Sequence, residues 1–388
     1  MVIKVKNPIN IKNLPIALYI AYLPCRSIIA IIAHNETITA VLTILIILLI
    51  QLYSVNRTGA RLCNATLILF TIIAIAYLET ILLYPQNIPF IIEYSPVIIY
   101  ALMALYFFGR KLDYEDLIKG VRLGSIILFF YWQITIVSGN MILEDGGEYS
   151  MSFGISLSLP SVIFLYDFFY NKPNLSIVFA SISAFEILLF GNKSMLIVIA
   201  LYILLAVYTK SEKKTIKRMC TILAYFLIFL LSDRIIETAV LFLERIGISS
   251  RSLRQMVAGR FFSLVQGTGG RSLIYEQSIE AIKRSPAFGY GIKGDMAVLG
   301  AYPHNFILEC AMQFGIPLTI IIISILVINI SITIKKDIKI RNYLLMLCTY
   351  AFTFLFVSGS FWALKEFWII VSLLIVSSKK IKEDYMHD

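Results

Sequence analysis

The chain has 388 residues, of which 59% are hydrophobic and only 15% are charged, and its mean hydropathy is +0.83. A soluble domain is about 45–50% apolar and about 25% charged, so this composition excludes an ordinary soluble protein. The formal net charge is +10. That charge fits either a nucleic-acid-binding protein or the Lys and Arg excess of cytoplasmic loops, and its distribution along the chain decides between the two.

Apolar runs recur along the chain with the length of membrane-spanning helices, which need roughly 17–25 residues. About twelve runs are found, at residues 14–33, 37–53, 62–83, 88–108, 121–137, 151–170, 175–190, 195–208, 219–231, 306–330, 343–357 and 361–376. The runs near residues 195 and 219 are short for a span. No small-x-small cleavage site follows the first run, so we expect a retained first helix.

The basic residues alternate with the predicted spans. If the N-terminus is cytoplasmic and every run spans, the inner segments hold most of the 34 Lys and Arg residues. The short outer loops then hold a single basic residue, Lys193, and the acidic loop at 139–150 also lies outside. This pattern follows the positive-inside rule. Topology therefore explains the basic charge, and we expect no nucleic-acid partner.

These patterns predict an all-α, polytopic integral membrane protein with about twelve transmembrane helices and both termini in the cytoplasm. Residues 1–232 would hold helices one to nine, residues 233–303 a large extracytoplasmic loop, and residues 304–388 the last three helices and a cytoplasmic tail. Apolar residues at helical spacing over 235–246 predict an amphipathic helix in the loop. A second loop helix is predicted from about Ser272 to Arg284.

His304 is the first candidate for chemistry. It follows Pro303 and precedes a long apolar helix that begins at Phe306. A helix N-terminus carries unpaired N–H groups and partial positive charge, which favours a nearby anion and a neutral histidine able to act as a base. Asn305 offers a helix cap or a hydrogen bond to a sugar hydroxyl. The competing interpretation is that His304 is an interfacial histidine that caps a helix.

Two cations are candidates for binding an anion. Arg271 follows a Gly-Gly break at the start of the second loop helix, and the planar fork of arginine suits phosphate oxygens. It competes with the interpretation as one of several solvated loop arginines, among them Arg260. Lys193 departs from the positive-inside trend, which suggests a local anionic partner.

Other polar features have weaker or competing interpretations. The segment from Gly289 to Gly294 matches G-x-G-x-x-G, but no βαβ unit surrounds it, so we interpret it as tight turns that lead the chain to His304. The three histidines and five cysteines form no cluster with metal-ligand spacing, and no metal site is expected. Charged residues inside the apolar runs indicate either a transporter's relay or structural pairing. They are Arg26, Glu79, Glu93, Asp167, Glu186, Lys365 and Glu366.

Taken together, the motifs resemble the O-antigen polymerase and ligase family of bacterial membrane enzymes. The family's large outer loop carries an Arg, a P-x-x-G-x-G turn and an HN-x-x-L-E segment followed by G-I. This chain has Arg271, the run from Pro286 to Gly291, the run from His304 to Glu309, and Gly315-Ile316. The resemblance covers about residues 191–317 by motif and the remainder by topology.

The resemblance implies a fold similar to the GT-C membrane glycosyltransferases and a metal-independent reaction without a cofactor. A glycan would pass from an undecaprenyl-pyrophosphate carrier to an acceptor sugar hydroxyl at the periplasmic or extracellular face of the bacterial inner (plasma) membrane. His304 would activate the acceptor and Arg271 would bind the pyrophosphate. Lys193, which stands where the family often has an Arg, would bind substrate. The other expected substrate-binding residues are Asn305, Tyr302, Glu309 and Arg260.

Three functions stay open at this stage. The first is a polymerase that joins lipid-linked repeat units into O-antigen, capsule or exopolysaccharide, with a flippase and a chain-length regulator as partners. The second is the ligase that moves finished glycan to lipid A-core, because the motifs do not separate the two. The third is a polytopic transporter, which would need Arg26, Glu79, Glu93 and Glu186 rather than His304 and Arg271.

Overall fold

In the computed structural model, the described residues are 12–59, 62–110, 114–138, 151–171, 174–190, 193–210, 271–336, 338–357 and 359–385, with three isolated positions between 238 and 245. These residues form helices and no strand, apart from one isolated bridge between Leu62 and Arg110. The helices before residue 211 are α1 (Leu14–Ile20), α2 (Tyr22–Ala33), α3 (Glu36–Thr58), α4 (Asn64–Leu83), η1 (Pro85–Asn87), α5 (Ile88–Phe108), α6 (Tyr114–Val137), α7 (Met151–Tyr166), the π-helical η3 (Asp167–Asn171), α8 (Asn174–Phe190) and α9 (Lys193–Lys210). The later helices are α12 (Arg271–Arg284), α13 (Gly294–Leu299), α14 (Phe306–Lys336), α15 (Ile338–Val357) and α16 (Lys365–Tyr385).

Within the described part of the chain, seven helices are long and apolar enough to cross a membrane, or up to eight if the bent pair α1 and α2 counts as one span. α8 and α9 are apolar but shorter. The predicted loop helix near 272–284 is confirmed as α12. The predicted run at 219–231 and the amphipathic helix at 235–246 lie outside the described residues, apart from isolated positions in the latter. The full set of twelve spans therefore stays a prediction.

The chain divides into two compact units, which we describe separately. Unit 2 comprises residues 122–268 and contains most of α6 together with α7, α8 and α9. Here the rings of Phe129, Phe164 and Phe179 pack with centroids 5.1 to 5.5 Å apart. Two of the intramembrane carboxylates are paired in this unit, because Arg122 binds Asp167 and Gln133 donates to Glu186 over 2.8 Å. Pairing is thus the observed state of both carboxylates.

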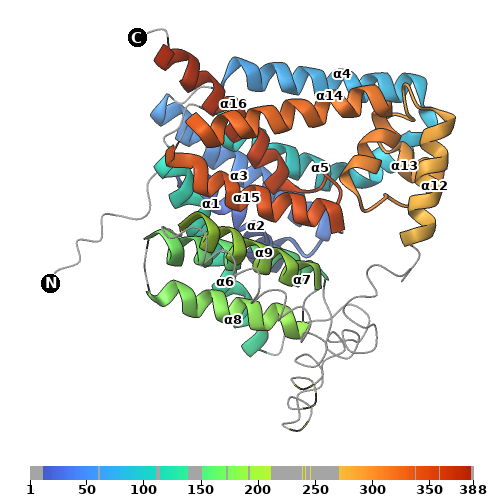
Figure 1. The fold of residues 1–388 in the computed structure, drawn as a ribbon. Helices are drawn as coiled ribbons and strands as arrows, with labels where there is room; N and C mark the ends of the chain where they lie inside the picture. The colour runs from blue at the N-terminus through green and yellow to red at the C-terminus, as the bar shows by residue number, and fades with distance from the viewer. Residues whose placement is uncertain are drawn as a thin grey trace. The chain divides into compact units, whose positions relative to one another are not determined.

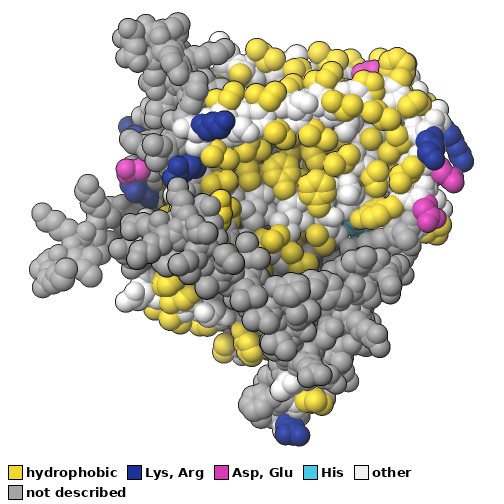
Figure 2. Space-filling model, in the orientation of Figure 1, with side chains coloured by type: hydrophobic (Ala, Val, Ile, Leu, Met, Phe, Trp, Pro, Cys, Tyr) yellow, Lys and Arg dark blue, Asp and Glu magenta, His cyan; other side chains and the backbone are white. Residues whose placement is uncertain are grey.

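Unit 1 comprises residues 1–121 and 269–388 and holds the candidate motif stretch. Within it, α5 packs on α16, and α14 packs on both α15 and α16. The short helix α12 packs against α14 and runs across its direction (Figure 1). Apolar side chains gather on the visible face of α14 (Figure 2). Several apolar residues of α14 are exposed, among them Ile320 at 59%. A helix surface of exposed apolar side chains is what we expect where a helix faces lipid.

Candidate functional site

A break in α14 organises the motif stretch. Gly315 has φ 76° and ψ 169°, so a helix from Phe306 ends there and a second helix continues to Lys336. Pro317 has no N–H and cannot bond to the carbonyl of Gln313, one helical turn earlier. The Gly291 N–H donates to that carbonyl instead, over 2.9 Å. The G-x-G turn therefore satisfies a backbone acceptor that the proline leaves without its helical partner.

Two further backbone hydrogen bonds complete this interlock. The carbonyl of Met312 accepts from the Tyr290 N–H over 2.8 Å, and the Ile316 N–H donates to the Pro286 carbonyl over 2.8 Å. Both groups would have paired with each other in an unbroken helix. The backbone groups of α14 that lose their helical partners at the break are thus paired with backbone groups of the turn at 286–291, and we call this set of bonds the interlock.

Glycine is required on both sides of the interlock. A Cβ on Gly315 would lie 2.3 Å from the carbonyl oxygen of Ala287, and one on Gly289 would lie 2.6 Å from that of Met312. Both glycines also have φ in the left-handed half of conformational space, 76° and 66°. Only glycine allows such a conformation together with such a close backbone approach. The interpretation of the segment from Gly289 to Gly294 as tight turns is confirmed by the positive φ of Gly289 and Gly291, 66° and 74°.

The turn is also fixed to the end of α4. The Asn87 side-chain amide donates to the carbonyls of Tyr290 and Ile292 over 2.7 and 3.0 Å. The Thr80 hydroxyl accepts from the Ile292 N–H over 3.0 Å. Asn87 is fully buried, and a Cβ on Gly291 would lie 2.7 Å from the Tyr84 ring. The G-x-G-x-x-G segment is therefore enclosed by protein on this side, as expected for a structural turn.

His304 lies just before α14 in a backbone conformation that histidine seldom adopts. Its φ is 54°, in the left-handed region, which costs of order 1 kcal/mol or more for a residue with a Cβ. Its ring packs on that of Tyr302, with centroids 4.1 Å apart, and both side chains are half-buried. A strained backbone that holds a partly exposed titratable ring in one orientation is typical of functional sites.

Asn305 caps the helix. Its side-chain oxygen accepts from the backbone N–H groups of Ile307 and Leu308 over 3.0 and 3.2 Å, and its carbonyl accepts from the Glu309 N–H. Of the two roles left open for Asn305, the structure therefore contains the cap. Because the cap already takes two N–H groups at the start of α14, these two donors are not open to an anion, which revises the expectation drawn from the sequence.

Glu309 lies one turn further and is completely buried. Its carboxylate accepts hydrogen bonds from the Ser360 hydroxyl and, over 3.3 Å, from the Phe361 N–H. Both of its oxygens thus hold the segment between α15 and α16 against α14. In this state the side chain stabilises the site and is not exposed to a substrate.

Three buried polar residues near the turn, Lys293, Asp295 and Gln313, were not predicted from the sequence. The Gln313 amide donates to Asp295 over 2.9 Å and accepts from the Trp362 indole N–H over 2.7 Å. Lys293 is 2% exposed, and its ammonium lies 4.4 Å from the centroid of the Tyr94 ring. Burial raises the pKa of the Asp295 carboxyl above its usual range, and the nearby Lys293 ammonium opposes that shift. The sequence signal that could have identified this cluster is the pair of opposite charges, Lys293 and Asp295, within a short segment of turns and apolar residues.

For two of the three predicted cations, Arg271 and Lys193, the structure describes the backbone but not the side chain. Arg271 is the first residue of α12, whose residues Ala281 and Ile282 pack against Ala311 and Met312 of α14. Lys193 is the first residue of α9, in unit 2. The side chains of both cations, and the whole of Arg260, lie outside the described part of the structure. Among the residues described, no group of three or more His, Cys, Asp or Glu side chains is placed to hold a metal ion.

The described residues form apolar helices long enough to cross a membrane, and the turn at 286–291 is bonded to the break in one of them, α14. These features define a helical, multi-pass membrane protein. Residues 175–323 match the family model described as O-antigen ligase, which confirms the resemblance to the O-antigen polymerase and ligase family. Members of this family are glycosyltransferase-like enzymes. The match includes α8, α12, the interlocked turn and the His304 segment. No curated protein matches the chain.

Proposed function

We propose that the protein is a polysaccharide polymerase. It transfers a glycan from an undecaprenyl-pyrophosphate carrier to a sugar hydroxyl of a second lipid-linked repeat unit, in the inner (plasma) membrane of a bacterium and on its outer side. One observation carries the proposal: His304 is held in a strained conformation, against Tyr302, within the segment that matches the family. The family implies lipid-linked glycan substrates, and the apolar surface of α14 suits such substrates.

In the proposed reaction, the neutral imidazole of His304 takes the proton of the acceptor hydroxyl. The acceptor oxygen attacks the anomeric carbon of the donor, and the bond from that carbon to the pyrophosphate oxygen breaks. The pyrophosphate leaves with the bonding electrons, so cations beside it lower the barrier. We assign this role to Arg271, with Lys193 and Arg260 as further donor-binding cations.

Tyr302 and Asn305 orient the acceptor side of the site. Tyr302 restricts the orientation of the His304 ring through the contact at 4.1 Å. Asn305 uses its oxygen as the helix cap, while its amide nitrogen makes no hydrogen bond to any described residue and belongs to a half-exposed side chain. That nitrogen can donate to a sugar hydroxyl without loss of the cap. In this proposal Glu309 does not contact sugar; it stabilises the site through its hydrogen bonds from Ser360 and Phe361.

The ligase that transfers finished glycan to lipid A-core is the second candidate, because the matching family model carries that description. It would use the same proton transfer and the same leaving group. The two enzymes differ in the acceptor, and we favour the polymerase because polymerases form the larger and more varied group.

The test is a glycan ladder from a deletion strain that carries His304→Ala, Arg271→Ala or Lys193→Ala at matched expression. Two variants serve as controls. His34→Ala removes an exposed histidine that also has a positive φ, of 50°, and Arg284→Ala removes an exposed arginine from the other end of α12. The proposal predicts loss of the ladder for the site variants and a normal ladder for the controls.

The products separate the candidates. A single repeat unit on lipid A-core identifies a polymerase, whereas long glycan left on the lipid carrier identifies a ligase. A normal ladder from His304→Ala would refute the proposed site. Loss of the ladder from Glu93→Ala alone would favour a transporter, although Glu93 and Glu79 are exposed in this structure.

A further inference from the structure

A partly buried cation, Lys365, begins α16 at the same end of unit 1 as His304. Lys365 is the first residue of α16, and its side chain is 17% exposed. The ring of Phe306, at the start of α14, packs on Phe361 and Phe367 with centroids 5.7 and 5.6 Å apart. These contacts, together with the bonds from Glu309 to Ser360 and Phe361, fix the start of α16 beside the start of α14.

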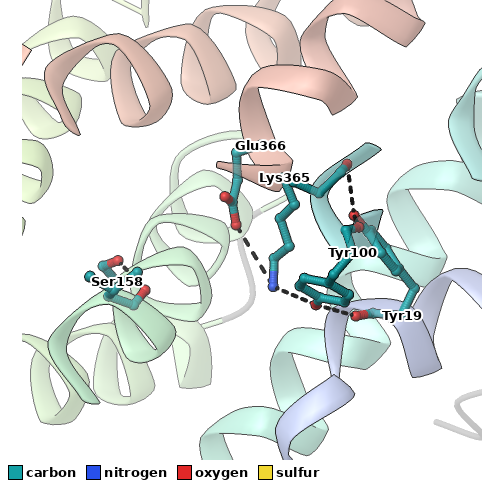
Figure 3. Close-up of polar contacts among 7 residues, drawn as sticks. Tyr19, Tyr100, Ser158, Lys365 and Glu366 are labelled. Carbon is teal, nitrogen blue, oxygen red and sulfur yellow. Dashed lines mark hydrogen bonds and ion pairs between the residues drawn. The ribbon is translucent and has the colours of Figure 1, made fainter. Parts of the chain in front are cut away.

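The Lys365 ammonium has two polar contacts with the described residues, and both are long. It donates to the Tyr100 hydroxyl over 3.3 Å and lies 3.9 Å from an oxygen of Glu366 (Figure 3). A good hydrogen bond from an ammonium to an anion is about 2.7–2.9 Å long, and an ammonium has three N–H donors. Consecutive residues of a helix do not face each other, so Glu366 is badly placed to provide such a bond.

Tyr100 is held in place as an acceptor for the lysine. Its hydroxyl donates to the carbonyl of Tyr19 over 2.9 Å, and the Tyr19 hydroxyl donates to the carbonyl of Tyr100 over 2.9 Å. Because the Tyr100 hydroxyl donates its proton to Tyr19, its oxygen acts as the acceptor for Lys365, and a dashed line in Figure 3 marks that contact. The exchange lies beside the 80° bend between α1 and α2, and it ties that bend to α5. The ammonium is thus fixed in position, although the described residues do not fill its three N–H donors.

We propose that Lys365 binds a phosphate oxygen of the lipid-linked donor. This inference rests on the proposed function and adds to it a cation whose surroundings the structure describes. An ammonium in an apolar region is costly unless anionic or polar oxygens surround it. Among the described residues its contacts to Tyr100 and Glu366 are long, so its N–H donors can take a further oxygen. A phosphate oxygen at the end of a polyprenyl chain has the charge and the membrane depth for that contact.

The probe for the test is radiolabelled undecaprenyl diphosphate without sugar, retained by the purified full-length protein on a spin column. Lys365→Met should weaken retention at least about tenfold, as expected for one lost hydrogen bond to a charged group. Lys365→Arg should bind within about threefold of the parent because it keeps the charge. Glu366→Gln should bind as tightly as the parent or more tightly, because the competing carboxylate is removed. Lys335→Met, at an exposed position near the end of α14, is the control.

Each contrary result has a separate meaning. If Lys365→Met and Glu366→Gln both lower the thermal midpoint while retention of the probe is unchanged, the pair is structural and the inference is wrong. If Lys365→Met weakens retention only of a donor that carries an acidic sugar, the ligand is a sugar carboxylate and the phosphate assignment is wrong. A parent protein that retains no probe would instead overturn the proposed donor, and this inference with it.

Discussion

Replacement of Gly315 by alanine tests the interlock that places His304. Gly315 has φ 76° and ψ 169°, a conformation that is nearly restricted to glycine and costs about 1–3 kcal/mol for other residues. The added Cβ would also lie 2.3 Å from the Ala287 carbonyl oxygen. The Cβ is rigidly attached to the backbone and the oxygen belongs to the backbone, so neither can turn aside, and the turn at 286–291 must move by roughly 1 Å to reach ordinary contact distance.

That movement strains three hydrogen bonds, from Ile316 to Pro286, from Tyr290 to Met312 and from Gly291 to Gln313. Each contributes about 0.5–1.5 kcal/mol. The conformational cost and the three bonds together give an expected destabilisation of about 2.5–7.5 kcal/mol for Gly315→Ala. Gly300→Ala is the matched control, because Gly300 has φ 71° but no atom within 4 Å of the Cβ position. The control carries only the conformational cost, about 1–2 kcal/mol.

The assay is the thermal unfolding midpoint in detergent, followed by tryptophan fluorescence. Two of the three tryptophans, Trp362 and Trp368, lie in unit 1, and Trp362 bonds to Gln313 beside the interlock. Gly315→Ala should lower the midpoint well below that of Gly300→Ala and should shorten the glycan ladder. Equal midpoints for the two variants would refute the close approach of the two segments.

Three further predictions follow from the packing of single side chains. Asn305→Ala removes the cap of α14 and should destabilise the protein by about 1 kcal/mol in thermal unfolding, whereas Asn305→Ser should recover most of the loss. A raised pKa at Asp295 means that its contribution to stability is complete below the unfolded pKa of about 3.9 and is lost as the pH rises through the folded pKa. Asp295→Asn should therefore gain stability relative to the parent as the pH of the melt rises from about 4 to about 8, and Glu280→Gln, at an exposed position, serves as the control. Arg122→Met leaves the buried Asp167 without its cation, so the double variant with Asp167→Asn should melt at a higher temperature than Arg122→Met alone; a lower midpoint for the double variant would contradict this.

The sequence predicts much of the helical fold, because an apolar run of span length has few alternatives to a helix. The helix at about 272–284 was also predictable, since Pro286 marks its end. The start of α16 was less so. The apolar run begins at Phe361, but residues 361–363 form a turn and the helix begins at Lys365, because Glu309 binds Ser360 and the Phe361 N–H from a distant segment.

The same limit applies to the candidate site. His304 and Asn305 were found because their spacing from a helix start has a local physical meaning. Lys293, Asp295 and Gln313 were missed because their partners lie far away in the sequence, and no local pattern shows that an ion will be buried. Glu309 was predicted to bind substrate from its place in the motif, yet its burial depends on a segment about fifty residues later.

The motif stretch therefore contains residues of two physical kinds. One kind builds the interlock: these residues accept or release its backbone hydrogen bonds or permit the close approach of its two segments, and no substrate is needed to explain them. They are Pro286, Gly289, Gly291, Gly315 and Pro317. His304 is different, because nothing in the interlock requires a histidine at a left-handed position. A glycine or an asparagine would occupy that position at lower cost. Because the residue is strained at a position where the interlock does not call for histidine, and lies in the family-matching segment, we assign the function to its imidazole.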